Sequence, residues 1–127
     1  MRENRNNAQP PTTVLVVDDD MAVRNSLKFS LEIEGFAVRV YADGRELLDD
    51  PHLPPDGCLI VDQVMPGMSG LDLARAVKRM QPRVHVVLAS GYGAGIATEL
   101  GDELSGATLL LKPFNFDELE QAVFRKP

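Results

Sequence analysis

Four apolar runs in this chain each end on a residue suited to phosphate chemistry. Val14–Val17 precedes Asp18-Asp19-Asp20, Cys58–Val61 precedes Asp62, Val84–Ala89 precedes Ser90, and Leu109–Leu111 precedes Lys112. Carboxylates held close together raise one another's pKa unless a cation lies among them, and oxygen ligands of this kind suit Mg²⁺. With a phosphoryl group present, Mg²⁺ and the Lys112 ammonium would neutralise its charge, Ser90 would donate a hydrogen bond, and one carboxylate could attack phosphorus.

The runs that precede these residues must bring them to one place. Short runs of Val, Ile and Leu without polar alternation are typical of strands buried on both faces of a parallel sheet. Ligands of such sheets bind outside the carboxyl ends of the strands, where neighbouring loops diverge. The sequence therefore predicts that the polar residues meet at one edge of a sheet.

Helical segments follow each expected strand, and their apolar residues recur every three or four positions. The expected strands are 14–17, 37–41, 58–61, 84–89 and 108–111, and the helical stripes are Val23/Leu27/Leu31, Leu73/Val77/Met80, Ile96/Leu100/Leu104 and Leu119/Val123, with a short helix through Leu48. This alternation predicts an α/β fold with a single doubly wound five-stranded parallel sheet, flavodoxin-like, and helices on both faces.

Polar residues predict where several helices begin. Asp20 is favoured as the cap of the first helix rather than as a metal ligand, and Gly35 marks its end. Asp43 with Glu46, and Asn115 with Glu118, are capping boxes that open two later helices.

Composition narrows the class of protein. The 127 residues suit one domain, with 44% hydrophobic and 25% charged residues. A net charge of −6 argues against nucleic-acid binding and against docking on anionic lipid. The only cysteine, Cys58, lies in an apolar run, residues 1–12 form a polar and flexible leader, and no stretch is long enough to span a membrane. We expect a cytoplasmic protein whose folded domain spans 13–127.

The motifs together resemble the receiver domain of response regulators from bacterial two-component systems. They are Val16-Val17-Asp18-Asp19, Asp62 with Met65-Pro66-Gly67, Ala89-Ser90-Gly91 and Lys112-Pro113-Phe114, in family order from Val14 to about Phe124. The resemblance implies a receiver-type fold and a phosphorylation-controlled switch rather than an enzyme with an external substrate. Its phosphodonor would be a histidine kinase or a histidine phosphotransfer protein, and a downstream protein would bind the switched form.

The resemblance also assigns roles to residues. Asp62 would be the phosphoacceptor, and Ser90 and Lys112 would contact the phosphoryl group. Asp18, Asp19, Asp62 and the backbone carbonyl of Val64 would hold Mg²⁺. The bond between Lys112 and Pro113 would be cis, as in the family.

Three positions determine how the switch would behave. Leu109 stands where receivers usually carry Tyr or Phe, so an aromatic readout of phosphorylation is not expected. Val64 and Tyr92 stand at the family positions that flank the water attacking the phosphorylated aspartate. Because Val64 cannot hydrogen-bond that water and the Tyr92 ring can shield the phosphoryl group, we expect slow self-dephosphorylation.

Two alternatives to a single-domain regulator remain, one a close variant of it and the other a protein of a different class. The chain could be the receiver half of a DNA-binding transcription regulator. It could also be a phosphatase of the haloacid-dehalogenase type, with Asp18 as nucleophile and Asp20 as acid/base, although that hypothesis leaves Asp62 without a role. His85, in a strand, and His52, in a loop, are interpreted as structural residues.

Overall fold

The computed structural model describes residues 12–91, 100–101 and 104–124. Five parallel strands form one sheet, as the sequence predicted, and their order in the sheet is β2-β1-β3-β4-β5. The strands are β1 (Thr13–Val17), β2 (Ala37–Tyr41), β3 (Asp56–Asp62), β4 (Arg83–Ser90) and β5 (Thr108–Leu111). The helices are α2 (Met21–Ile33), α3 (Gly44–Leu48), α4 (Gly70–Met80) and α6 (Phe116–Phe124).

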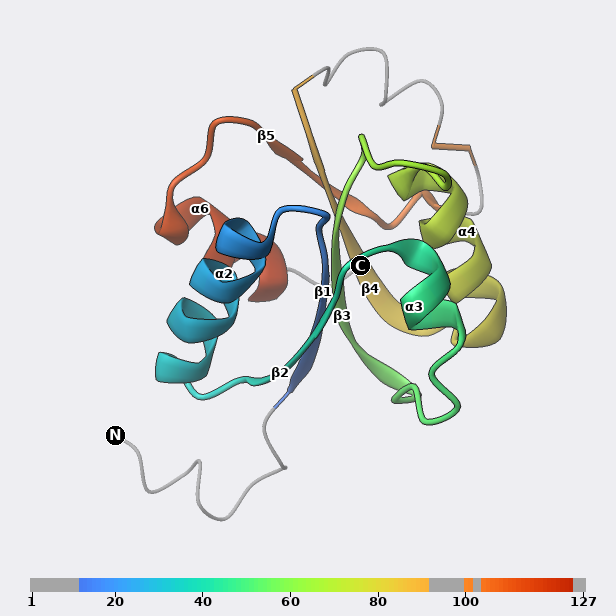
Figure 1. Cartoon of the computed structure of the whole chain (residues 1–127), viewed down its shortest axis with the longest axis horizontal. Coiled ribbons are helices and arrows are strands. Elements are labelled where there is room, and N and C mark those ends of the chain that lie inside the picture. The colour runs from blue at the N-terminus through green and yellow to red at the C-terminus, as the bar shows by residue number, and fades with distance from the viewer. Residues whose placement is uncertain (1–11, 92–99, 102–103, 125–127) are drawn as a thin grey trace.

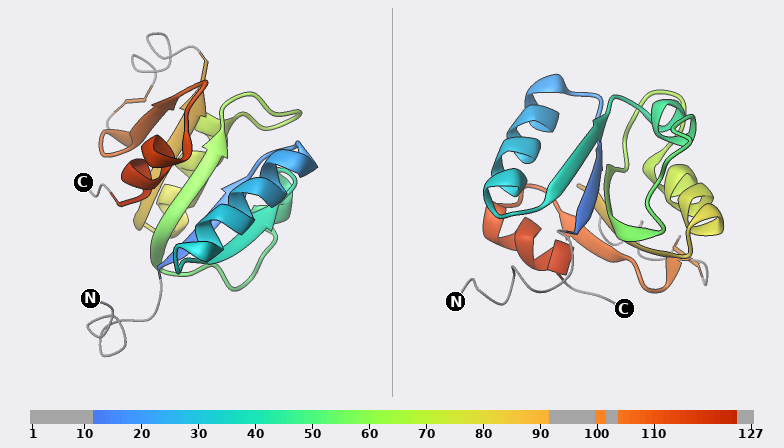
Figure 2. Two further views of the ribbon diagram at one scale, coloured as in Figure 1. Left: turned by 90° about the vertical axis from the view of Figure 1, so that its left-hand side faces the viewer. Right: turned by 90° about the horizontal axis from the view of Figure 1, so that it is seen from below.

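Helices cover both faces of the sheet. In Figure 1, α2 and α6 lie on one side of the strands and α3 and α4 on the other, and the views of Figure 2 agree. Two separate hydrophobic clusters result. One, beneath α3 and α4, includes Leu73 and Val77, and the other, beneath α2 and α6, includes Leu31 and Leu119. The sheet, whose central strands β1, β3 and β4 are buried on both faces, separates them.

The helix starts follow the predicted caps, with one change. The Asp20 side chain accepts hydrogen bonds from the amides of Ala22 and Val23 and caps α2. Asn115 and Glu118 form the predicted reciprocal pair at α6, with bonds of 2.8 and 2.9 Å. At α3, Asp43 caps the Glu46 amide.

The change concerns the return bond of the α3 capping box. The Glu46 carboxylate accepts its bond from the amide of Ala42, at 2.6 Å, one residue earlier than a regular capping box would place it.

Two residues expected in the core are exposed. Met80 is 48% exposed because it is the last residue of α4, whose buried side runs through Leu73, Ala74 and Val77. Val23 is 38% exposed because it lies in the first turn of α2, beside an open groove described below.

Some predictions fall partly outside the described residues. These are the leader, of which only residue 12 is described, Tyr92, and the helix carrying Ile96. Within the described part, Leu104 is fully buried and Leu100 packs against the cluster beneath α3 and α4. None of the helices in the described ranges combines the length and apolar character needed to cross a bilayer.

Candidate functional site

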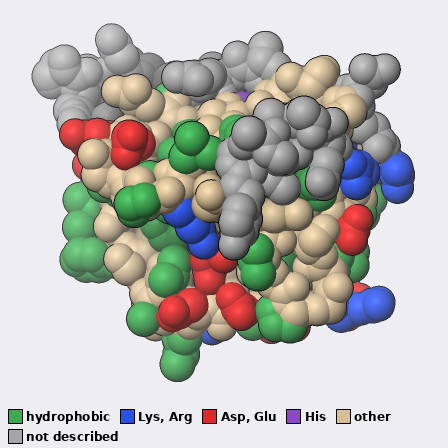
Figure 3. Space-filling model, turned by 90° about the horizontal axis from the view of Figure 1, so that it is seen from above, with side chains coloured by type: hydrophobic (Ala, Val, Ile, Leu, Met, Phe, Trp, Pro, Cys, Tyr) green, Lys and Arg blue, Asp and Glu red, His purple; other side chains and the backbone are tan. Residues whose placement is uncertain are grey.

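The carboxyl ends of four strands bring the predicted residues together. Asp18 directly follows β1, Asp62 and Ser90 are the last residues of β3 and β4, and Lys112 directly follows β5. The strand register aligns Asp62 with Ala89, and Ser90 with Leu111. The backbone amide of Lys112 donates to the Ser90 carbonyl at 2.9 Å, which joins the last two positions. The edge that Figure 3 views from above shows acidic side chains beside a basic one near its centre.

Asp62 and Lys112 form the central contact of the site. The Lys112 Nζ lies 2.9 Å from Oδ2 of Asp62, although 50 residues separate them in the chain. The other carboxylate oxygen, Oδ1, accepts the backbone amide of Val64 at 3.2 Å. The Asp62 side chain is 12% exposed and that of Lys112 is 42% exposed, so a ligand can reach the pair from solvent.

Three carboxylates face this single lysine. Oxygen atoms of Asp18, Asp19 and Asp62 all lie within 4.8 Å of one another. Burial raises the pKa of Asp18, and the neighbouring charges of Asp62 and Asp19 raise it further, whereas the Asp20 amide and Lys112 oppose the shift. The ionised cluster is therefore short of positive charge, and its hard oxygen donors fit a divalent cation such as Mg²⁺.

The loop after Asp62 is fixed by a close backbone contact. A Cβ on Gly70 would lie 2.6 Å from the Asp62 carbonyl oxygen and 2.8 Å from Cα of Gln63. The Gly70 amide donates to the Gln63 carbonyl, and the Gln63 side chain accepts the amide of Leu71. Glycine thus lets α4 begin against the end of β3, which holds the turn through Val64 beside the carboxylates.

Sequence reasoning missed two supports of the site. Gln63 is one. Its hydrogen bonds with the start of α4 depend on where that helix meets β3, and the sequence carries no pattern that predicts them. Arg24 is the other, since its guanidinium donates to the backbone carbonyl of Asp18 at 2.8 Å. The spacing from Asp18 to Arg24 could have suggested this contact once the first helix was placed.

Other predicted positions have clear structural settings. The peptide bond between Lys112 and Pro113 is cis. Leu109 is partly buried against the cluster beneath α3 and α4. His85 is 4% exposed, and its Nε2 lies within hydrogen-bond distance of the Thr108 hydroxyl and the Ala122 carbonyl oxygen, which fits the structural role predicted for it. Asp20 is occupied as a helix cap, which argues against the phosphatase hypothesis.

An apolar groove opens from the site along α2. It has a volume of about 670 Å³ and extends from the carboxylates to Val23, Leu27 and Phe114. A second hollow of about 390 Å³ shares these three residues and continues between α2 and α6. The edge of the sheet that carries the carboxylates and the side of α2 therefore form one continuous surface.

Comparison with known proteins agrees with this geometry. Residues 14–124 match the family described as "Response regulator receiver domain". The transcriptional regulatory protein FixJ of Bradyrhizobium diazoefficiens is 33% identical over 106 residues, which cover 84% of this chain and 52% of FixJ. Sporulation initiation phosphotransferase F of Bacillus subtilis is 28% identical over 87% of this chain and 89% of its own length.

Solved structures share the fold over most of the chain. The chemotaxis protein CheY4 of Vibrio cholerae superimposes with a TM-score of 0.81 and 26% identity, covering 92% of this chain and 99% of that one. The chain spans about half the length of the first curated relatives that it matches.

Proposed function

The chain belongs to the response regulator receiver domain family of two-component systems, and on that premise we propose that Asp62 is its phosphoacceptor. The observation that carries the proposal is the ion pair between Asp62 and Lys112 at an edge that also holds Asp18 and Asp19. Receiver domains are phosphoacceptor switches that take phosphoryl groups from histidine kinases. We propose residues 13–127 as the extent of this domain.

Asp62, Lys112 and Ser90, at the carboxyl edge of the sheet, have separate roles in the proposed phosphoryl transfer. An oxygen of the Asp62 carboxylate attacks phosphorus, and the bond from phosphorus to the donor breaks as the new P–O bond forms. The Lys112 ammonium pairs with Oδ2 of Asp62 before transfer and would pair with a phosphoryl oxygen after it. Ser90, at the end of β4, donates its hydroxyl to another phosphoryl oxygen.

The acidic cluster fits Mg²⁺, which receiver domains generally bind in an acidic pocket. Asp18, Asp19 and Asp62 would hold the ion by their side chains, and Val64 by its backbone carbonyl. When bound, Mg²⁺ supplies positive charge that offsets the repulsion between the incoming phosphoryl group and the carboxylates.

Exchange of Asp62 for asparagine tests the phosphoacceptor. The protein is incubated with Mg²⁺ and a small acyl phosphate, and the modified residue is located by mass spectrometry. We expect one acyl phosphate on Asp62 in the wild type and none in Asp62→Asn, because the amide is nearly isosteric but cannot attack. Phosphate on any residue of the variant, or multiple turnover of the ester by the wild type, would contradict the proposal.

We propose further that the helical phosphodonor, a histidine kinase or a histidine phosphotransfer protein, docks along α2. Met21, Phe29 and Ile33 on this helix are 63%, 67% and 66% exposed, which is unusual for large apolar side chains. Figure 3 shows hydrophobic side chains gathered on its left, the side on which α2 lies. A helix laid against α2 would cover them and reach Asp62 along the groove.

Two donors distinguish docking from chemistry. Phe29→Asp with Ile33→Asp should slow transfer from a cognate histidine donor and leave phosphorylation by a small acyl phosphate unchanged, since both residues lie away from the carboxylates. Equal rates from the protein donor in variant and wild type would refute docking on α2. Loss with both donors would indicate damage to the site itself.

A further inference from the structure

The turn that carries two of the proposed metal ligands is held by a side chain from α2. Arg24 is the fourth residue of this helix, and its Nη1 donates a hydrogen bond to the backbone carbonyl oxygen of Asp18 at 2.8 Å. The bond is partly buried and spans six residues, from the helix back to the residue that follows β1. Hydrogen bonds from charged donors are stronger than those between neutral groups. Arg24 therefore ties the turn firmly to the helix.

Backbone amides hold the same turn on either side of this bond. The amide of Asp18 donates to the carbonyl oxygen of Tyr41 at 3.3 Å, and the amide of Asp20 donates to Oδ1 of Asp18 at 2.9 Å. The peptide group between Asp18 and Asp19 is planar, so a carbonyl fixed by Arg24 also fixes the direction in which the chain enters Asp19. The backbone of Asp19 is thus constrained from both ends.

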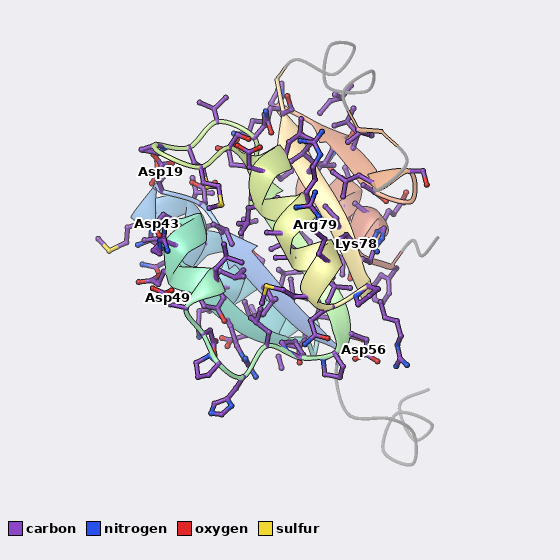
Figure 4. The ribbon with its side chains drawn as sticks, turned by 90° about the vertical axis from the view of Figure 1, so that its right-hand side faces the viewer. Asp19, Asp43, Asp49, Asp56, Lys78 and Arg79 are labelled. Atoms are coloured by element: carbon purple, nitrogen blue, oxygen red, sulfur yellow. The ribbon has the colours of Figure 1, made fainter. Side chains whose placement is uncertain are left out.

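Asp19 depends on this constraint more than Asp18 does. Asp18 is 9% exposed, whereas Asp19 is an exposed residue. Figure 4 shows Asp19 near the loop that leads from β3 to α4, and its carboxylate belongs to the cluster with Asp18 and Asp62. Core packing does not hold an exposed side chain, so the direction of its backbone determines where its oxygen atoms lie relative to the other two carboxylates.

We propose that Arg24 is a positioning residue that makes the acidic cluster prefer Mg²⁺ over Ca²⁺, an inference that rests on the Mg²⁺ site proposed above. Mg²⁺ requires a nearly ideal octahedron with oxygen atoms at about 2.0–2.1 Å, whereas Ca²⁺ accepts flexible arrangements at about 2.3–2.6 Å. A turn fixed by Arg24 holds the carboxylates of Asp18 and Asp19 in one arrangement. A looser turn would therefore weaken the binding of Mg²⁺ more than that of Ca²⁺.

The charge of Arg24 would act in the opposite direction. Its guanidinium is a positive charge in contact with the backbone of a ligand residue. Loss of that charge alone should strengthen the binding of both ions about equally, because both carry two positive charges. Loss of the hydrogen bond should instead weaken Mg²⁺ binding. The sign of the change therefore distinguishes positioning from charge.

Calorimetric titration of the full chain, with Mg²⁺ alone and with Ca²⁺ alone, measures both dissociation constants. Arg24→Met keeps an unbranched side chain but removes the donors and the charge. We expect it to raise Kd for Mg²⁺ by about tenfold and Kd for Ca²⁺ by less than about threefold. Lys28→Met is the matched control, since it removes a cation of the same helix that pairs with Glu32 at 2.8 Å, and it should leave both constants unchanged.

Arg24→Lys is the milder second variant in the same titrations. Its ammonium can still donate one hydrogen bond to the Asp18 carbonyl, but without the planar fork of arginine, so it should recover part of the preference for Mg²⁺. The melting temperature of each metal-free variant measures any general loss of stability, which would weaken the binding of both ions alike.

Three results for Arg24→Met would overturn the proposal. These are an unchanged preference for Mg²⁺ over Ca²⁺, tighter binding of both ions, and an equal loss of affinity for both. A wild type that binds neither ion would instead contradict the metal site proposed above, and the role of Arg24 with it.

Discussion

At the scale of single residues, Asp19 is the most direct probe of the proposed metal site because it is exposed and belongs to the carboxylate cluster. Mg²⁺ should stabilise the wild type by mass action, by about 2.7 kcal/mol at a hundredfold excess over Kd. Asp19→Asn should lose most of this effect, as measured by melting temperature against Mg²⁺ concentration.

Asp20→Asn is the matched control for this prediction. It removes the same charge one residue away, and asparagine still caps α2. The control should therefore respond to Mg²⁺ as the wild type does. An undiminished response in Asp19→Asn would place the metal elsewhere.

Val64 bears on the lifetime of the phosphorylated state. Its side chain is 66% exposed and its amide bonds to Asp62, so it stands beside the reacting carboxylate without offering a side-chain hydrogen bond. Val64→Asn should speed decay of the acyl phosphate several-fold, because the amide can orient the attacking water. The readout is loss of phosphate from the purified phosphoprotein.

Val64→Ala, in the same assay, distinguishes the effect of adding a polar group at position 64 from the effect of removing side-chain volume. It removes bulk without adding a polar group, so it should accelerate decay less than asparagine does. A wild-type half-life of seconds, or an asparagine variant no faster than the wild type, would contradict the expected slow turnover.

At the scale of elements, Tyr41 ties the edge strand β2 to the loop after α3. Its hydroxyl donates to Asp50 at 2.6 Å, and this bond is the main cause that lowers the pKa of Asp50. A carboxyl group with a lowered pKa adds stability above its ordinary titration range and loses it as the pH falls through the folded-state value. Tyr41→Phe should therefore reduce the free energy of unfolding at neutral pH.

The same argument fixes how this loss depends on pH. The difference between Tyr41→Phe and the wild type should shrink as the pH falls through the lowered folded-state pKa of Asp50, below which Asp50 is protonated in both the folded and the unfolded state. Urea unfolding at several pH values measures it. A difference that is constant across this range would show that the hydroxyl does not act through the Asp50 charge.

How far the sequence predicted each element depended on how local its determinants are. β2 and β5 have the predicted bounds. β5 is a short apolar run that Lys112 and Pro113 end, whereas β2 is an edge strand whose residues alternate between exposed and half-buried. The prediction that Met80 is buried was wrong, because a stripe of three apolar residues leaves the rotation of a helix about its axis uncertain by a fraction of a turn. The gathering of Asp18, Asp62 and Lys112 was predictable because each follows or ends a strand of a parallel sheet, whereas the support from Gln63 depends on how α4 meets β3.

At the scale of the whole molecule, the sheet separates two independent cores. Val77 lies in the cluster beneath α3 and α4, and Val123 in the cluster beneath α2 and α6. Exchange of either for alanine should cost about 2 kcal/mol of unfolding free energy, from lost burial and the cavity left behind. Because the sheet lies between them, the double variant should lose the sum within about 0.5 kcal/mol.

A double-mutant cycle by urea denaturation measures this additivity. Val77→Ala combined with Leu73→Ala, within one cluster, provides the comparison in which coupling is expected. Strong coupling between Val77 and Val123 would mean that the two cores respond to substitution as one.

The contact between Asp62 and Lys112 also has a meaning for a chain still being made on the ribosome. The two residues lie 50 positions apart, so β3, which ends at Asp62, emerges and can pair with β1 well before Lys112 has been translated. Until the last strand has been translated and has paired with β4, a nascent chain holds carboxylates without their counter-charge. On the proposed role of Lys112, competence to receive a phosphoryl group arrives only with the final segment, and we expect a truncated or half-folded product to draw no phosphate away from finished molecules.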